Sequence, residues 1–242
     1  MSLEVRALAG LPEVRAGDDL AALIAPEVRG GDVVAIAHKV VSKAEGRVVP
    51  LESVAPGSEA LRLASDFGKD ARLVQVVLDE SVSVIRASHG VLICETHHGF
   101  ICANAGVDMS NAPDDDVAVL LPLDPDASAR RIRAGLGGSA CGVIVADSFG
   151  RPWRLGVTDV AIGAAGVRVL EDWRGRRDAH GRELSATEIA VADQLAAAAD
   201  LARSKDSQEP VVVIRGAEHL ITDEDGPGAA ALRRPRDLDL FR

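Results

Sequence analysis

Residues 32–37 read Asp-Val-Val-Ala-Ile-Ala, and they lead directly into the polar pair His38-Lys39. Such a short, β-branched apolar run favours a buried strand over a helix. Residues 141–146 are a second run of this kind and are followed by Asp147. Around both runs, helix-like and strand-like segments alternate to about residue 216, which predicts mixed α and β structure around an aliphatic core.

Further helices are expected on either side of these strands. Asp18 and Asp19 can cap a helix over residues 18–28, and Asp124-Pro125 can open one that ends near residue 136. Residues 58–80 are helical in pattern, and Gly68 is compatible with a break into two helices. The sequence Ser185-Ala-Thr-Glu188 matches a capping box and predicts a helix to about residue 203.

The remaining segments predict strands and two irregular regions. Strands are expected over residues 81–87, 91–96, 100–103, 117–121 and 210–214, with a hairpin turn at 97–99. Residues 147–158 are rich in Gly, Arg, Trp and Pro, which predicts an irregular functional loop. Residues 217–242 contain Asp-Glu-Asp-Gly-Pro-Gly and an Arg-rich end, which predicts a tail or linker.

Composition excludes several functional classes. The 242 residues suit one compact domain or two interlocked lobes. Asp and Glu (37) outnumber Lys and Arg (27), and the net charge of -10 has the wrong sign for binding nucleic-acid backbones. Aromatic residues make up only 2%, without any Tyr, so surfaces for base stacking are scarce.

The same composition favours a cytoplasmic protein. Apolar runs fall well short of the ~18 residues that span a bilayer. The N-terminus lacks the basic and apolar regions of a signal peptide. The three cysteines are odd in number and lie in apolar runs, as expected of packed thiols in a reducing compartment.

Two acidic residues follow apolar strands and enter polar loops. Asp108 lies in Ala103-Asn-Ala-Gly-Val-Asp-Met-Ser-Asn111, and Asp147 precedes Ser148. Carboxylates and hydroxyls are the hard oxygen ligands that Mg²⁺ or Mn²⁺ prefers, so Asp108 and Asp147 are candidates to share an ion. The alternative is that both are turn formers, because Asp bonds well to its own backbone.

A basic cluster follows the strand at residues 32–37. It contains Lys39, Lys43 and Arg47, which could neutralise nucleotide phosphates, and Arg151 and Arg154 follow Asp147. A solvated charged turn is the alternative. A metal, lysines and arginines together favour phosphoryl transfer, although the common phosphate-loop and dinucleotide glycine motifs are absent. Zinc is not expected at His97-His98, because metal-ligand spacing is missing and adjacent hairpin residues point apart.

At these segments the sequence resembles the coenzyme F420:L-glutamate ligase family. The resemblance runs from about residue 3 to 216. It is carried by Gly10-Leu-Pro-Glu13, Gly17-Asp-Asp-Leu20, Lys39-Val-Val-Ser-Lys-Ala-Glu-Gly-Arg47, Ala103-Asn-Ala-Gly-Val-Asp108 with Asn111, Leu121-Pro with Asp124-Pro-Asp-Ala-Ser-Ala129, Phe149-Gly-Arg-Pro-Trp-Arg154 and Thr158-Asp-Val-Ala-Ile-Gly163. Several ordered motifs make it far more specific than one short pattern.

The resemblance implies a GTP-dependent ligase that adds L-glutamate to the deazaflavin precursor F420-0 through an acyl phosphate, and then extends a γ-linked glutamate tail. It also implies an α+β fold with a mixed sheet and two interlocked lobes, assembled as an intertwined homodimer. Two ions of Mg²⁺ or Mn²⁺ per site, and K⁺ as a further cation, belong to the same expectation.

Matched position by position, the resemblance also implies a site. Leu11, Pro12, Glu13 and Val14 would contact the guanine nucleotide, together with His38, Lys43 and Asn111. Asp108 and Asp147 would bind a first metal ion and Ser148 a second, and Asp108, Asp147 and Lys43 would act in catalysis.

The sequence departs from the family pattern at three places. His38 stands where Ser or Thr is usual, and Ser148 replaces a common Thr but keeps the hydroxyl. In mycobacterial relatives the ligase domain is fused to a flavin-binding nitroreductase-like domain, and residues 222–241 resemble the segment that leads into it. No such domain is expected within residues 217–242, and two explanations stay open: it is encoded separately, or the chain was cut at this boundary. The alternatives to the ligase are a nucleotide- or deazaflavin-binding module without turnover of its own, and a metal-dependent phosphohydrolase or ligase acting on another substrate.

Overall fold

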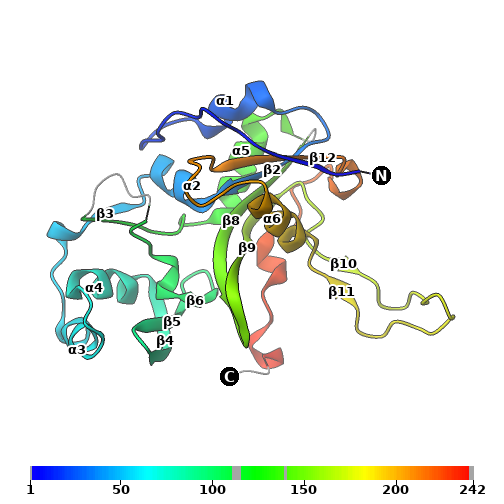
Figure 1. Cartoon of the computed structure of the whole chain (residues 1–242). Coiled ribbons are helices and arrows are strands. Elements are labelled where there is room, and N and C mark those ends of the chain that lie inside the picture. The colour runs from blue at the N-terminus through cyan, green and yellow to red at the C-terminus, as the bar shows by residue number, and fades with distance from the viewer. Residues whose placement is uncertain (1, 111–115, 139–140, 240–242) are drawn as a thin grey trace.

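A five-stranded mixed sheet forms the centre of the molecule (Figure 1). The computed structural model describes residues 2–110, 116–138 and 141–239. The strand order is β1 (Glu4–Ala7), β12 (Val211–Arg215), β2 (Val33–Ala37), β8 (Gly142–Arg151) and β9 (Arg154–Ala165). Only β2 and β8 run parallel in this sheet, and the other neighbours are antiparallel. The two runs predicted as buried strands are thus confirmed as its central pair.

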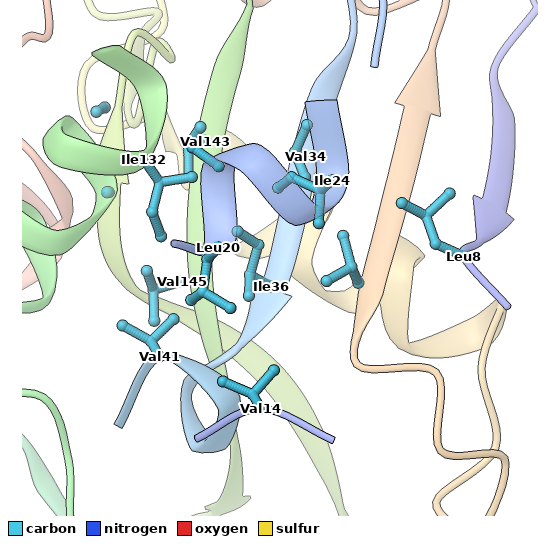
Figure 2. Close-up of a cluster of buried hydrophobic side chains, with 14 of the residues drawn as sticks. Leu8, Val14, Leu20, Ile24, Val34, Ile36, Val41, Ile132, Val143 and Val145 are labelled. Carbon is cyan, nitrogen blue, oxygen red and sulfur yellow. The ribbon is translucent and has the colours of Figure 1, made fainter. Parts of the chain in front are cut away.

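Helices cover both faces of the sheet, because alternate side chains of a strand point to opposite sides. Val34 and Ile36 pack with α1 (Leu20–Ile24) and α5 (Pro125–Gly135) on one side. Figure 2 shows this cluster, in which Leu20, Ile24 and Ile132 meet the strands. Val33 and Ala35 pack on the other side against α6 (Val191–Leu201). The 3₁₀ turn η1 (Ala25–Glu27) extends α1 almost to the predicted end at residue 28.

The chain between α2 (His38–Ala44) and α5 builds a second, smaller unit, here called the inserted lobe, over residues 48–119. It contains the pair β3 (Val48–Pro50) and β7 (Val117–Val119), the helices α3 (Ser58–Phe67) and α4 (Ala71–Asp79), and the sheet β4 (Ser81–Ser88), β5 (Val91–Thr96) and β6 (Ile101–Ala103). It has its own apolar cluster around Leu63, Val77 and Leu92. The rest of the chain is called the sheet lobe, and the α+β class with a mixed sheet is confirmed.

Local signals explain where several helices begin and end. Gly68 adopts φ 63°, a left-handed conformation that ends α3, and the Asp70 side chain then caps α4. Asp124 accepts a bond from the Ala127 backbone N–H and caps α5, which has Pro125 at its start. The predicted break at Gly68 and the predicted start of α5 are both confirmed.

Two predictions of local structure are wrong. Residues 147–158 are not an irregular loop, because β8 continues to Arg151 and pairs with β9 from Arg154 onward. The capping box at 185–188 does not open a helix, because Glu188 and Ile189 form β11, which pairs with β10 (Glu171–Asp172). Helix α6 starts only at Val191, and β10 and β11 belong to an arm that extends from the body (Figure 1).

The segment expected as a tail folds back on the sheet lobe. The Asp126 carboxylate of α5 accepts bonds from the backbone N–H groups of Ala164 and Ala229, at 2.8 and 2.7 Å. The buried Arg133 side chain bonds Asp225 at 2.7 Å and the carbonyl of Thr222 at 2.6 Å. The 3₁₀ turns η5 (Glu218–Leu220), η6 (Ala229–Leu232) and η7 (Arg236–Leu238) lie in this segment. The domain boundary at residue 216 stays a prediction.

Within the described ranges, the helices are all too short or too polar to cross a bilayer.

Candidate functional site

The candidate site lies at the carboxyl end of β2, where the parallel pairing of β2 with β8 stops. Ala37, the last residue of β2, pairs with Ala146 of β8. The residues that follow this pair are His38, which begins α2, and Asp147, which lies within β8. Carboxyl ends of neighbouring parallel strands are a common place for ligand sites in α/β proteins. The register alone thus brings two predicted site residues together.

His38 contacts Asp147 directly. The distance from His38 Nε2 to Asp147 Oδ1 is 3.2 Å, and the same oxygen accepts a bond of 2.7 Å from the Ser148 backbone N–H. The His38 side chain is only 3% exposed, and its Nδ1 is without a hydrogen-bond partner among the described residues. The imidazole therefore contacts Oδ1 of Asp147, a carboxylate that is predicted to bind metal.

The next residue of α2 contacts the other predicted metal ligand. Lys39 Nζ lies 2.7 Å from Asp108 Oδ2 and donates to Ser110 Oγ at 2.6 Å. Burial alone would raise the pKa of Asp108, but the bonds from Lys39 and from the Ser110 backbone hold this pKa below its usual value. Asp108 also pairs through its backbone with Val119, which attaches it to the inserted lobe. Consecutive residues of α2 thus reach the two aspartates.

Lys43, one turn further along α2, contacts the segment predicted to bind nucleotide. Its Nζ lies 2.6 Å from Oε1 of Glu13, whose side chain is largely exposed. Val14 of this segment packs in the apolar cluster with Val41 of α2, and Figure 2 shows both side chains in that cluster. The Gly17 backbone N–H also donates to the Ala44 carbonyl at 2.9 Å. Residues 11–14 therefore lie beside α2, with Leu11 partly buried and Pro12 exposed.

Ser148 belongs to a separate polar cluster with residues that the sequence did not single out as site residues. It faces Asp159 across the β8–β9 pair, and its Oγ donates to Asp159 Oδ1 at 2.6 Å. Arg203 bonds the other carboxylate oxygen, and Lys205 Nζ lies 2.7 Å from Ser148 Oγ. Burial would raise the pKa of Asp159, but Ser148 and the two cationic side chains lower it. The pairing of β8 with β9 brings Ser148 to Asp159, and the segment after α6 brings Arg203 and Lys205 to both.

Other candidates lie elsewhere. Asn111 is outside the described residues. Arg151 and Arg154 lie at the tip of the β8–β9 hairpin, where Arg151 bonds the Leu155 carbonyl at 2.7 Å. His97 and His98 bond different backbone carbonyls, those of Asp79 at 2.9 Å and Pro122 at 2.8 Å. Arg151, His97 and His98 thus form bonds within the fold.

The three cysteines are buried thiols. Burial raises the pKa of Cys102 to about 12, and the nearby charges of Asp147 and Cys94 add to the shift. Burial raises the pKa of Cys94 and of Cys141 as well. A thiol with a raised pKa is a poor nucleophile, because the thiolate is the reactive form.

The donor set at Asp108 and Asp147 fits a hard divalent cation. Mg²⁺ is commonly held by one or two carboxylates, with water and substrate phosphates as its other ligands. Groups of three or more His, Cys, Asp or Glu side chains suited to a metal are absent from the described part of the chain. Two carboxylates, completed by water and phosphate oxygens, would be a donor set of the kind that Mg²⁺ or Mn²⁺ accepts.

Known proteins resemble the chain over nearly its whole length. The family model described as F420-0:gamma-glutamyl ligase matches residues 10–216. A protein from Methanothermobacter thermautotrophicus, named coenzyme F420:L-glutamate ligase, is 45% identical over 100% of both chains. Proteins of the same name from Methanopyrus kandleri and Methanocaldococcus jannaschii are 48% and 41% identical, over 95% and 96% of this chain and 94% of each relative.

Proposed function

The chain belongs to the F420-0:gamma-glutamyl ligase family, and from this membership we propose that it joins L-glutamate to coenzyme F420-0 with hydrolysis of GTP. The names of the relatives support a ligase of coenzyme F420 biosynthesis. The proposal adds GTP as the phosphoryl donor, a divalent ion, K⁺ as a further cation, and a cytoplasmic homodimer with interlocked lobes.

The proposed reaction has two steps. A carboxylate oxygen of F420-0 attacks the γ-phosphorus of GTP, so that an acyl phosphate forms and GDP leaves. The amine of L-glutamate then attacks the acyl carbon, the C–O bond to phosphate breaks, and an amide and inorganic phosphate are formed. The amine loses a proton in this step. Later rounds repeat the sequence on the γ-carboxylate of the added glutamate.

A single observation supports this proposal most directly. The first turn of α2 contacts Asp147 through His38 and Asp108 through Lys39, and the next turn presents Lys43 to residues 11–14. One short helix therefore joins the predicted metal ligands to the predicted nucleotide segment. Phosphoryl transfer depends mainly on this kind of positioning and charge neutralisation.

Each side chain has a defined part in the proposal. Asp108 and Asp147 would hold Mg²⁺ or Mn²⁺, which supplies positive charge to the transferring phosphoryl group. Lys43 would move from Glu13 to a phosphate oxygen when GTP binds, because phosphate carries more negative charge than one carboxylate. Lys39 would stay near Asp108 and offset further charge on the nucleotide.

Mass spectrometry of the reaction tests the proposal. The protein is incubated with F420-0, L-glutamate, GTP and Mg²⁺ or Mn²⁺, and each component is left out in turn. We expect the deazaflavin to gain the mass of one or more glutamate residues only in the complete mixture. An unchanged deazaflavin, with folded protein and intact precursor, contradicts the proposal. GTP hydrolysis at the full rate without glutamate would instead indicate a phosphohydrolase.

A further inference from the structure

The polar cluster around Ser148 contains a cationic side chain, that of Lys205, next to the Ser148 hydroxyl. The family resemblance gives the Ser148 hydroxyl to a second metal ion, but here its oxygen accepts a bond from Lys205 Nζ at 2.7 Å. The same ammonium group lies 2.8 Å from Asp200 Oδ1 and 3.4 Å from Asp159 Oδ1. Three oxygen atoms of different residues thus surround one Nζ, as they would surround a small cation.

The most deeply buried member of the cluster is already neutralised. Asp159 is 1% exposed, and such a carboxylate needs a positive partner and hydrogen bonds to stay charged. Arg203, itself nearly buried, bonds one of its oxygens, and Ser148 Oγ donates to the other. Arg203 is fixed in turn by a bond of 2.9 Å to the Pro210 carbonyl.

The charges within the cluster balance without a metal ion. Asp159 and Asp200 carry two negative charges, and Arg203 and Lys205 carry two positive ones. A divalent ion would add two uncompensated charges next to an ammonium and a guanidinium. The Ser148 hydroxyl also donates its only proton to Asp159 while it accepts from Lys205. These residues do not fit a second divalent ion.

Lys205 is held at the cluster by its hydrogen bonds. Its Nζ donates to Ser148 Oγ at 2.7 Å and to Asp200 Oδ1 at 2.8 Å. Its side chain is nevertheless 61% exposed, so the ammonium is open to a ligand arriving from solvent. Lys205 can thus face a negatively charged ligand while it remains tied to the cluster.

We propose that the ammonium group of Lys205 takes the place of the second divalent ion beside Ser148. The protein then uses one divalent ion per site, bound at Asp108 and Asp147, and one tethered cation. This inference rests on the proposed function only in that the site binds a nucleotide and a divalent ion. Lys205 is a positioning residue, which holds positive charge next to Ser148 without taking part in bond making.

Manganese binding tests the substitution of a lysine for a metal ion. Free Mn²⁺ is measured by its electron paramagnetic resonance signal while the purified full-length protein is titrated, with and without GDP. The variants are Lys205→Gln, which removes the charge and offers an amide oxygen, and the matched control Lys205→Arg, which keeps the charge. We expect Lys205→Gln to bind about one more Mn²⁺ per chain than the wild type, and Lys205→Arg to match the wild type.

Two results would overturn the inference. One is a wild-type protein that already binds two Mn²⁺ per chain, and the other is a Lys205→Gln variant that gains none although its melting temperature shows that it is folded. Failure of the proposed function gives a different pattern. If the wild type binds no Mn²⁺, the assignment of Asp108 and Asp147 fails, but a gain in Lys205→Gln over the wild type still supports the role of Lys205.

Discussion

His38 Nε2 lies 3.2 Å from Oδ1 of Asp147, across the junction where β2 turns into α2. The contact follows from the parallel pairing of Ala37 with Ala146, because each contacting residue comes directly after a paired one. The predicted metal ligand Asp147 therefore contacts a buried imidazole, at a position where the family resemblance implies Ser or Thr.

Removing either carboxylate charge should abolish ligase activity and leave the fold intact. We expect Asp108→Asn and Asp147→Asn to lower kcat for glutamate addition by roughly 100-fold or more, because an amide binds a divalent ion far more weakly than a carboxylate. Asp66→Asn, at an exposed ion pair on α3, is the matched control. Turnover is measured by mass spectrometry and folding by circular dichroism. Near-normal activity in either site variant would refute the metal assignment.

Replacing His38 by the smaller hydroxyl residue should free one face of Asp147. We expect His38→Ser to bind Mn²⁺ more tightly than the wild type, because the imidazole no longer competes for Oδ1. The buried imidazole also fills space, so the variant should lose about 1 to 3 kcal/mol of stability. Mn²⁺ titration and urea unfolding measure the two effects. Weaker Mn²⁺ binding would mean that His38 supports Asp147 as a ligand.

Lys43 should contribute to nucleotide binding more than to the rate of the bound complex. We expect Lys43→Met to raise KM for GTP roughly 10-fold or more, which corresponds to the loss of one charge-assisted hydrogen bond to phosphate. The KM for L-glutamate should change little. Lys69→Met, at the α3–α4 junction, is the control. An unchanged KM for GTP would place Lys43 outside the nucleotide site.

The contribution of the Asp159–Arg203 ion pair to the free energy of unfolding should depend on pH. The folded-state pKa of Asp159 is lowered, so its contribution is present above the unfolded value near 3.8 and is lost as the pH falls through the folded-state pKa. Asp159→Asn should cost about 3 kcal/mol at pH 7, because it leaves a nearly buried guanidinium without its partner.

The difference in unfolding free energy between wild type and Asp159→Asn should narrow as the pH falls below 3.8, because the unfolded carboxylate then gains a proton before the folded one does. Urea unfolding of both proteins between pH 3 and pH 7 measures this change. A difference that stays constant over the whole range would show that the carboxylate charge is not the stabilising feature. Asp66→Asn again serves as an exposed control.

The sequence predicted those parts of the fold that depend on neighbours along the chain. The strand at 32–37, the break at Gly68 and the cap at Asp124 all rest on local patterns, and all three are confirmed. The hairpin over residues 147–158 was missed because its glycines and Pro152 resemble a loop, whereas pairing with β9 stabilises it. Trp153, at the turn, adopts φ 57°, which few residues other than glycine do.

The candidate site was likewise predictable only in part. Asp108, Asp147 and Lys43 stand out because each lies in a polar run next to an apolar strand. The roles of Asp159, Arg203 and Lys205 have no such local signal, because strand pairing and the end of α6 bring them to Ser148 from distant parts of the sequence. The cationic side chain that contacts Ser148 could therefore be found only from the three-dimensional arrangement.

Because the two lobes each supply one predicted metal ligand, binding of an ion should determine whether they unfold together. Asp108 belongs to the inserted lobe and Asp147 to the sheet lobe, and α2 lies at the boundary with one contact to each. An ion held by both carboxylates would be a cross-link between the lobes, and its binding free energy would add to the stability of both. Calorimetry should then show a broad or split melting transition without Mn²⁺ and a single, later transition with it.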